Sequence, residues 1–134
     1  MQPTRTTPQN QTKSLEIDIK IHSKTGNGDI ITLLQDLIVV WNDRTLLIPA
    51  GFASDGASVP QFLWSSVSPA IDPRTIRAAI VHDYLYRTAP AGWTRKDADE
   101  LFYDFCRRDG LSWWKSQKAY WGIRCFGGAA WQGE

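Results

Sequence analysis

Three short segments of the sequence carry side chains that could do chemistry. They cover residues 51–60 (GFASDGASVP), 82–86 (HDYLY) and 97–99 (DAD). The first consists mostly of small residues around one carboxylate, Asp55, and small residues let the backbone approach a ligand or an ion closely. The alternative is an ordinary loop in which Asp55 and Ser58 cap local turns.

His82 and Asp83 interrupt the apolar side of a predicted helix. Neighbouring residues on a helix point about 100° apart, so the imidazole and the carboxylate can face different partners. Tyr86 lies one turn after His82 and shares its face. A hydrogen-bonded core histidine beside a surface aspartate would explain the same residues without any chemistry.

Asp99 lies at the edge of the apolar stripe of the next predicted helix, where an unpaired carboxylate would cost several kcal/mol. If the two helices pair, Asp99 can meet His82, fix the tautomer of the ring and raise its basicity. A His82 open to a cleft would indicate catalysis. A sealed His82 with its nitrogens engaged would indicate a structural polar network.

The elements that must position these residues change character near the middle of the chain. Apolar and polar residues alternate over 15–21, which is typical of a strand with one wet face. Residues 37–41 and 45–48 are two further strand-like runs, joined across 42–44 in a predicted hairpin. These patterns predict a small antiparallel sheet in the first half.

Helical signals dominate the second half. Asp72 before Pro73 is typical of a helix start, and Thr94 with Asp97 forms a capping-box pattern. Ser112 is placed to begin a further helix. The expected helices run over about 73–87, 94–110 and 112–127.

Length and composition favour one domain. The 134 residues are 43% hydrophobic and 12% aromatic, and we expect a flexible tail over 1–14 and a single α+β domain over 15–134, in which the sheet packs on about three helices. A net charge of +1 gives no field that would attract nucleic acid. The longest apolar run, 37–41, is far shorter than the roughly 20 residues of a membrane span, and residues 1–14 lack the apolar core of a secretory signal.

The cysteines and tryptophans bear on the core. Cys106 and Cys125 are too few for a disulfide framework and are expected to be reduced. Four of the seven tryptophans lie at positions 113, 114, 121 and 131. Because large aromatics fill small cores, we expect them to seal the core; the alternative is an apolar surface for a partner or a lipid interface.

The motifs together resemble an uncharacterised domain family found widely in phages and prophages. The resemblance rests on G-F-x-x-D-G-A-S-V-P, H-D-Y-L-Y, A-D at 98–99 and the closing G-G-A-A-W, and it extends from about residue 37 to 131. It implies a viral context, with phage structural proteins as partners and the virion or the host cytoplasm as the location. It implies no activity and leaves the oligomeric state open.

Residues 78–102 are also similar to the active-site helices of the phospholipase A2 superfamily. The version in parvovirus capsid proteins is closest, because alanines stand there in place of the paired cysteines. This similarity implies His82 as general base, Asp99 as the residue that orients it and Tyr86 as a support for Asp99. It implies Asp83 as a calcium ligand.

The glycine-rich calcium loop of that superfamily is missing in its usual form. Residues 51–56 could replace it, with Asp55 as a further oxygen ligand, since calcium accepts about six to eight oxygens. The expected function is thus a phage-encoded protein with calcium-dependent hydrolysis of an ester, by analogy a lipid ester. The alternative is a non-catalytic virion, tail or assembly component, in which the His-Asp-Asp cluster fixes helix packing and the terminal aromatics dock a neighbouring subunit.

Overall fold

The computed structural model describes residues 19–23, 29–55, 59 and 72–133. Its N-terminal half holds the strands β1 (Ile19–Ser23), β2 (Asp29–Leu33), β3 (Leu37–Trp41), β4 (Arg44–Ile48) and β5 (Ala53–Ser54). Its C-terminal half holds the helices α2 (Ile76–Thr88), α3 (Arg95–Arg108) and α4 (Trp113–Phe126), followed by the short 3-10 helix η1 (Gly128–Ala130).

The described strands form two small antiparallel sheets. One has the order β1-β2-β5, and the other is the β3–β4 hairpin. The hairpin turns at Asn42 and Asp43, which have φ angles of 50° and 63° and belong to the residue types that tolerate left-handed backbone. The predicted α+β class, with strands before helices, is therefore confirmed.

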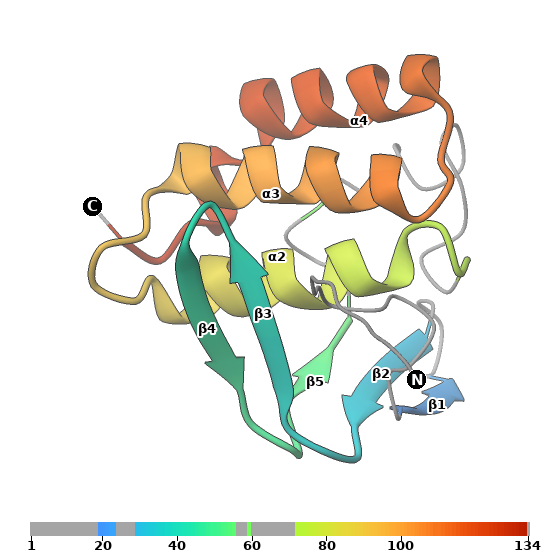
Figure 1. Ribbon diagram of the computed structural model, residues 1–134, viewed down its shortest axis with the longest axis vertical. Helices are drawn as coiled ribbons and strands as arrows, with labels where there is room; N and C mark the ends of the chain where they lie inside the picture. Colours follow the sequence, from blue (N-terminus) through green and yellow to red (C-terminus); the bar gives the residue numbers. More distant parts are fainter. Residues whose placement is uncertain (1–18, 24–28, 56–58, 60–71, 134) are drawn as a thin grey trace, which may run out of the picture.

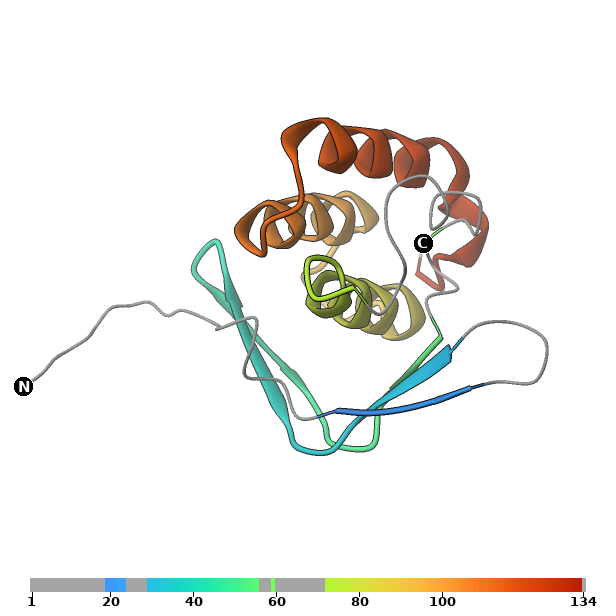
Figure 2. The ribbon, with the colours of Figure 1, turned by 90° about the vertical axis from the view of Figure 1, so that its right-hand side faces the viewer.

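The helices stack in order on one side of the strands (Figure 1). In Figure 2 the two sheets form an open V, with α2 inside it and α3 and α4 progressively farther out. α2 contacts both α3 and β5, and α3 contacts α4. The helix that carries His82 and Asp83 is consequently the central element of the molecule.

Burial follows this arrangement. On β3, Leu37, Val39 and Trp41 are buried while the residues between them are exposed, as the period of two requires. On α2, every residue from Ile76 to Asp83 is buried, because the helix is covered on several sides. Any polar side chain on α2 must therefore find partners inside the protein.

Most expected helix ends are confirmed. Thr94 and Asp97 form the predicted capping box of α3, and the Ser112 hydroxyl accepts from the backbone of Lys115 at the start of α4. α2 differs, because it begins at Ile76, three positions after Pro73. The Asp72 carboxylate is bound by Arg74, and a turn precedes the helix.

The remaining expectations, on the cysteines, the N-terminal tail, a membrane span and the tryptophans, have different outcomes. Cys106 is buried and Cys125 is exposed, and they form no disulfide with each other. The tail at 1–14 and the first residues of the expected strand, 15–18, lie outside the described residues. Among the described helices, none has the length and apolarity of a membrane span. The sealing role expected for the late tryptophans is wrong for Trp113, Trp114 and Trp121, which are exposed on α4, whereas Trp131 packs against the core.

Candidate functional site

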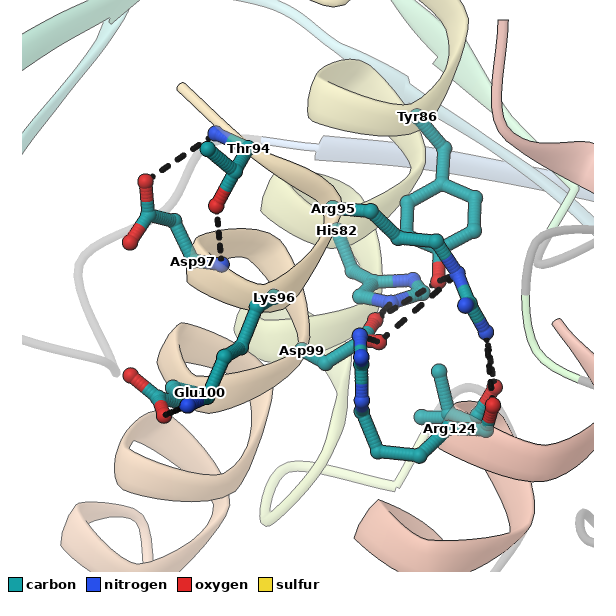
Figure 3. A network of polar contacts seen from close by, with 10 residues as sticks. His82, Tyr86, Thr94, Arg95, Lys96, Asp97, Asp99, Glu100 and Arg124 are labelled. Carbon is teal, nitrogen blue, oxygen red and sulfur yellow. Dashed lines mark hydrogen bonds and ion pairs between the residues drawn. The ribbon is translucent and has the colours of Figure 1, made fainter. Parts of the chain in front are cut away.

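The antiparallel pairing of α2 and α3 places His82 against Asp99 (Figure 3). Nε2 of His82 lies 2.8 Å from Oδ1 of Asp99, and both side chains are fully buried. The Tyr86 hydroxyl, one turn farther along α2, donates to the same oxygen at 2.7 Å. The contact between the two predicted helices is therefore present, and the Tyr86 hydroxyl binds the same carboxylate.

α4 adds a cation that the sequence did not reveal. Arg124 donates to Oδ2 of Asp99 at 2.8 Å. Arg95 lies 4.0 Å from the same oxygen, donates to the Tyr86 hydroxyl at 3.0 Å, and also donates to the carbonyls of Ile123 and Arg124 near the end of α4. Arg95 is four residues before Asp99 and could have been suspected from that spacing. No local signal pointed to Arg124.

The electrostatics of Asp99 favour a permanent charge. Burial by itself would raise the pKa of Asp99, but the hydrogen bond and charge of His82, together with hydrogen bonds from Tyr86 and Arg124, outweigh burial and lower it. The pKa of Tyr86 is raised, first by burial and then by its bond to Asp99. The carboxylate is thus ionised and the phenol neutral, so Nε2 of His82 carries a proton and donates it.

The imidazole itself is sealed. His82 has no exposed surface, and its ring packs against Tyr86 and, edge to face, against Phe102. A general base must reach water and substrate, whereas a packing residue need not. Arg124 also binds the carboxylate that holds the ring. The sealed position of His82 is the one expected of a structural polar network.

Asp83 lies apart from this network, toward β5. Its carboxylate accepts from the Ser54 hydroxyl at 2.6 Å and is 3.4 Å from the Arg87 guanidinium. Arg87 also donates to the Ala53 carbonyl and to Asp55. The structure therefore brings the two predicted calcium ligands, Asp83 and Asp55, to a common place, but it places a guanidinium between them.

The described residues at this place do not fit a calcium site. Arg87 brings a positive charge to the position where the metal would need oxygens, and Ser54 already occupies one oxygen of Asp83. Within the described ranges, no group of three or more His, Cys, Asp or Glu side chains is placed to hold a metal. Ser54 and Arg87 were missed from the sequence, although Arg87 follows Asp83 by one helical turn.

Comparisons with known proteins identify relatives without a known activity. A family model described as "Protein of unknown function (DUF1353)" matches residues 31–123. An uncharacterised protein, y4jT of Sinorhizobium fredii (strain NBRC 101917 / NGR234), is 32% identical over 80 residues, which are 60% of this chain and 23% of that protein. The chain thus spans about a quarter of the length of this relative. No solved structure matches. With the family model covering most of the described residues, the chain belongs to the DUF1353 family.

Proposed function

We propose that this chain is a non-catalytic component of a phage particle, in which the His82–Asp99 network fixes the packing of three helices. The observation that carries the proposal is the closure of the network. His82 and Asp99 are fully buried, and both carboxylate oxygens of Asp99 accept hydrogen bonds. The phage context rests on the resemblance of the sequence motifs to a family found in phages and prophages.

The network joins three helices, beside other polar contacts between them such as the buried Arg77–Asp109 ion pair. Asp99 on α3 accepts from α2 through His82 and Tyr86, and from α4 through Arg124. A buried ionic group is costly unless every partner is in place, so this cluster disfavours other packings of the helices more than it adds net stability. A rigid three-helix unit suits a protein that must present a surface to neighbours.

The outer face of α4 supplies such a surface. Ser116, Ala119 and Ile123 turn inward. Four large side chains remain exposed on the same helix, with exposed fractions of 53% to 70%: Trp113, Trp114, Trp121 and Phe126. Monomeric proteins rarely expose so many large apolar groups on one element, and tryptophan is enriched where proteins bind each other. This face supports docking to a neighbouring subunit.

Association with particles tests the proposal. In a lysogen that encodes the chain, particles are purified on a density gradient after induction, and the chain is quantified in each fraction by immunoblotting. We expect it to sediment with particles, and the double variant Trp114→Ser, Trp121→Ser to be lost from them while its circular dichroism is unchanged. Leu47→Ser, at an exposed apolar position on β4, is the matched control. Absence of the wild-type chain from particles would contradict the proposal.

A second candidate is favoured by one observation, the orientation of His82 by Asp99 with Tyr86 behind it. These are the roles implied by the resemblance to the phospholipase A2 superfamily. In this candidate the ring nitrogen not bound to Asp99 takes a proton from water, the water oxygen bonds to the carbonyl carbon of a lipid ester, and the proton passes to the departing alkoxide. It requires that water reach a histidine that is sealed in the structure.

Release of fatty acid from phosphatidylcholine vesicles tests this candidate. The wild-type chain, His82→Gln and Asp83→Asn are compared with added calcium and with a chelator, after circular dichroism has shown that each is folded. The proposal of a non-catalytic particle component expects no release above the level of His82→Gln. Calcium-dependent release that is lost in folded His82→Gln and reduced in Asp83→Asn would establish the hydrolase and overturn the non-catalytic assignment.

A further inference from the structure

A hollow of about 330 Å³ lies where the tip of the β3–β4 hairpin meets α3 and α4. Its lining includes two carboxylates on α3, Glu100 and Asp104, and none of the described residues that line it is a lysine, arginine or histidine. Four aromatic side chains contribute walls to it: Trp41, Tyr103, Tyr120 and Trp121. Aromatic faces and carboxylates both attract cations, so the hollow has the chemistry of a cation site.

The carboxylates are placed to accept further hydrogen bonds. Oδ2 of Asp104 accepts from the indole of Trp41 at 2.8 Å, and none of the described residues donates a hydrogen bond to Oδ1. Among the described residues, Glu100, one turn earlier on the same helix, pairs only with Lys96, at 3.8 Å and exposed to solvent. Exposed pairs of this kind are weak and exchange readily. The negative charge beside the aromatic walls is therefore available to a ligand.

A neighbouring site that also combines aromatic rings with a carboxylate is filled by one of the chain's own side chains. The guanidinium of Arg44 lies 4.1 Å from the ring centre of Trp93 and 5.2 Å from that of Trp41, and it pairs with Asp97 at 3.2 Å. Trp41 thus borders both places. Two indoles and an aspartate hold an arginine in the first site. In the hollow, the exposed indole of Trp121 and two tyrosines lie beside two carboxylates.

We propose that this hollow binds an arginine side chain of a partner protein. A guanidinium stacks on aromatic rings and donates in-plane hydrogen bonds to carboxylates. It can therefore contact both the aromatic and the acidic side chains that line the hollow. A quaternary ammonium, as in a choline headgroup, could contact the rings but has no N–H for Asp104 or Glu100. The inference rests on the proposed function, because it makes this partner the neighbouring subunit that also meets Trp121.

The test is a titration of the full chain, followed by the indole N–H signals of Trp41 and Trp121 in nitrogen-15 NMR spectra. The probes are the acetylated amides of arginine, of lysine and of citrulline, and choline chloride. We expect saturable shifts with the arginine probe, binding weaker by about fivefold or more with lysine and choline, and none with citrulline, which is nearly isosteric but neutral. Binding of citrulline equal to that of arginine, or tighter binding of choline, would overturn the proposal.

Variants locate the binding. Glu100→Gln with Asp104→Asn keeps side-chain shape and the acceptor for Trp41, and we expect it to weaken arginine binding about tenfold. Asp36→Asn, at the opposite end of β3, is the matched control and should bind as the wild type does. If the double variant bound the arginine probe with wild-type affinity, the hollow would not be the binding site.

The particle experiment separates this inference from the proposed function. The Glu100→Gln, Asp104→Asn chain should be depleted from particles, and wild-type incorporation would show that the partner does not use the hollow. If the wild-type chain is itself absent from particles, the proposed function fails whether or not the arginine probe binds. A concentration-dependent dimer that is lost in the double variant would replace the partner with a second copy of this chain.

Discussion

Two aspartates on α3 occupy opposite situations. Asp99 is fully buried between three helices, and its two oxygens are bound by side chains of α2 and α4. Asp104, five residues later, is half-buried, has one oxygen bound by Trp41 and borders an open hollow. The first has the chain's own cation, Arg124, beside it, whereas none of the described residues that line the hollow beside the second is a cation.

The contrast shows how position on one helix decides what a carboxylate does. Five residues correspond to about 140° around the axis, so Asp99 turns toward α2 while Asp104 turns toward the hairpin. A charge enclosed by packed helices must be compensated internally, and it then contributes to structure. A charge at the margin of a hollow remains available for binding.

The largest expected effect comes from removing the enclosed carboxylate. Asp99→Leu leaves His82, Tyr86 and Arg124 without their acceptor, and we expect the free energy of unfolding to fall by about 3–5 kcal/mol. Asp104→Leu loses one partly exposed hydrogen bond and should cost about 1 kcal/mol. Urea unfolding measures both. Equal losses would remove the distinction between the two aspartates.

The pH dependence of stability sharpens the same comparison. Because the folded pKa of Asp99 is lowered, its stabilising contribution is present above the unfolded value near 3.8 and is lost as pH falls through the folded value. Asp72 and Asp97 are shifted in the same direction, so the whole protein should lose stability below about pH 4. Asp99→Asn should show a shallower acid slope than wild type. Thermal unfolding between pH 2 and about 7 would show this, and parallel profiles would contradict it.

A smaller effect is expected from the tyrosine hydroxyls. Tyr86→Phe removes a bond to Asp99 and an acceptor for Arg95, and should cost about 1–2 kcal/mol. Tyr103→Phe removes only a 3.3 Å contact from Gln117 at the margin of the hollow, and should change stability by less than about 0.5 kcal/mol. Chemical denaturation of the pair checks the difference. If Tyr103→Phe lowered the free energy of unfolding more than Tyr86→Phe, the surroundings of Asp99 could not be the more important of the two regions for stability.

The smallest effect on folding is expected at the exposed aromatics. Trp121→Ser should leave the free energy of unfolding within about 0.5 kcal/mol, because the side chain is 60% exposed. The same variant should weaken binding of the arginine probe and incorporation into particles. A large loss of stability would mean that Trp121 packs in the fold and does not serve a partner.

Several features could be predicted from local sequence because their causes are local. The capping box of Thr94 and Asp97 and the N-cap at Ser112 depend on residues three positions apart. The shared face of His82 and Tyr86 follows from the helical period, and the need of Asp99 for a partner follows from the apolar residues around it. The order of strands before helices is likewise visible in the change of period.

Other features were decided only in the tertiary structure. Arg124 reaches Asp99 across 25 positions, and Ser54 reaches Asp83 across 29, because of how α4 and β5 pack beside α2 and α3. No residue close in sequence to Arg124 or to Ser54 indicates that these contacts will form. The exposure of Trp121 and the closure over His82 depend in the same way on which faces the neighbouring elements cover. The sequence by itself determined which residues would seek partners, through local periodicity and the cost of burying charge, and the packing of distant elements decided which partners they found.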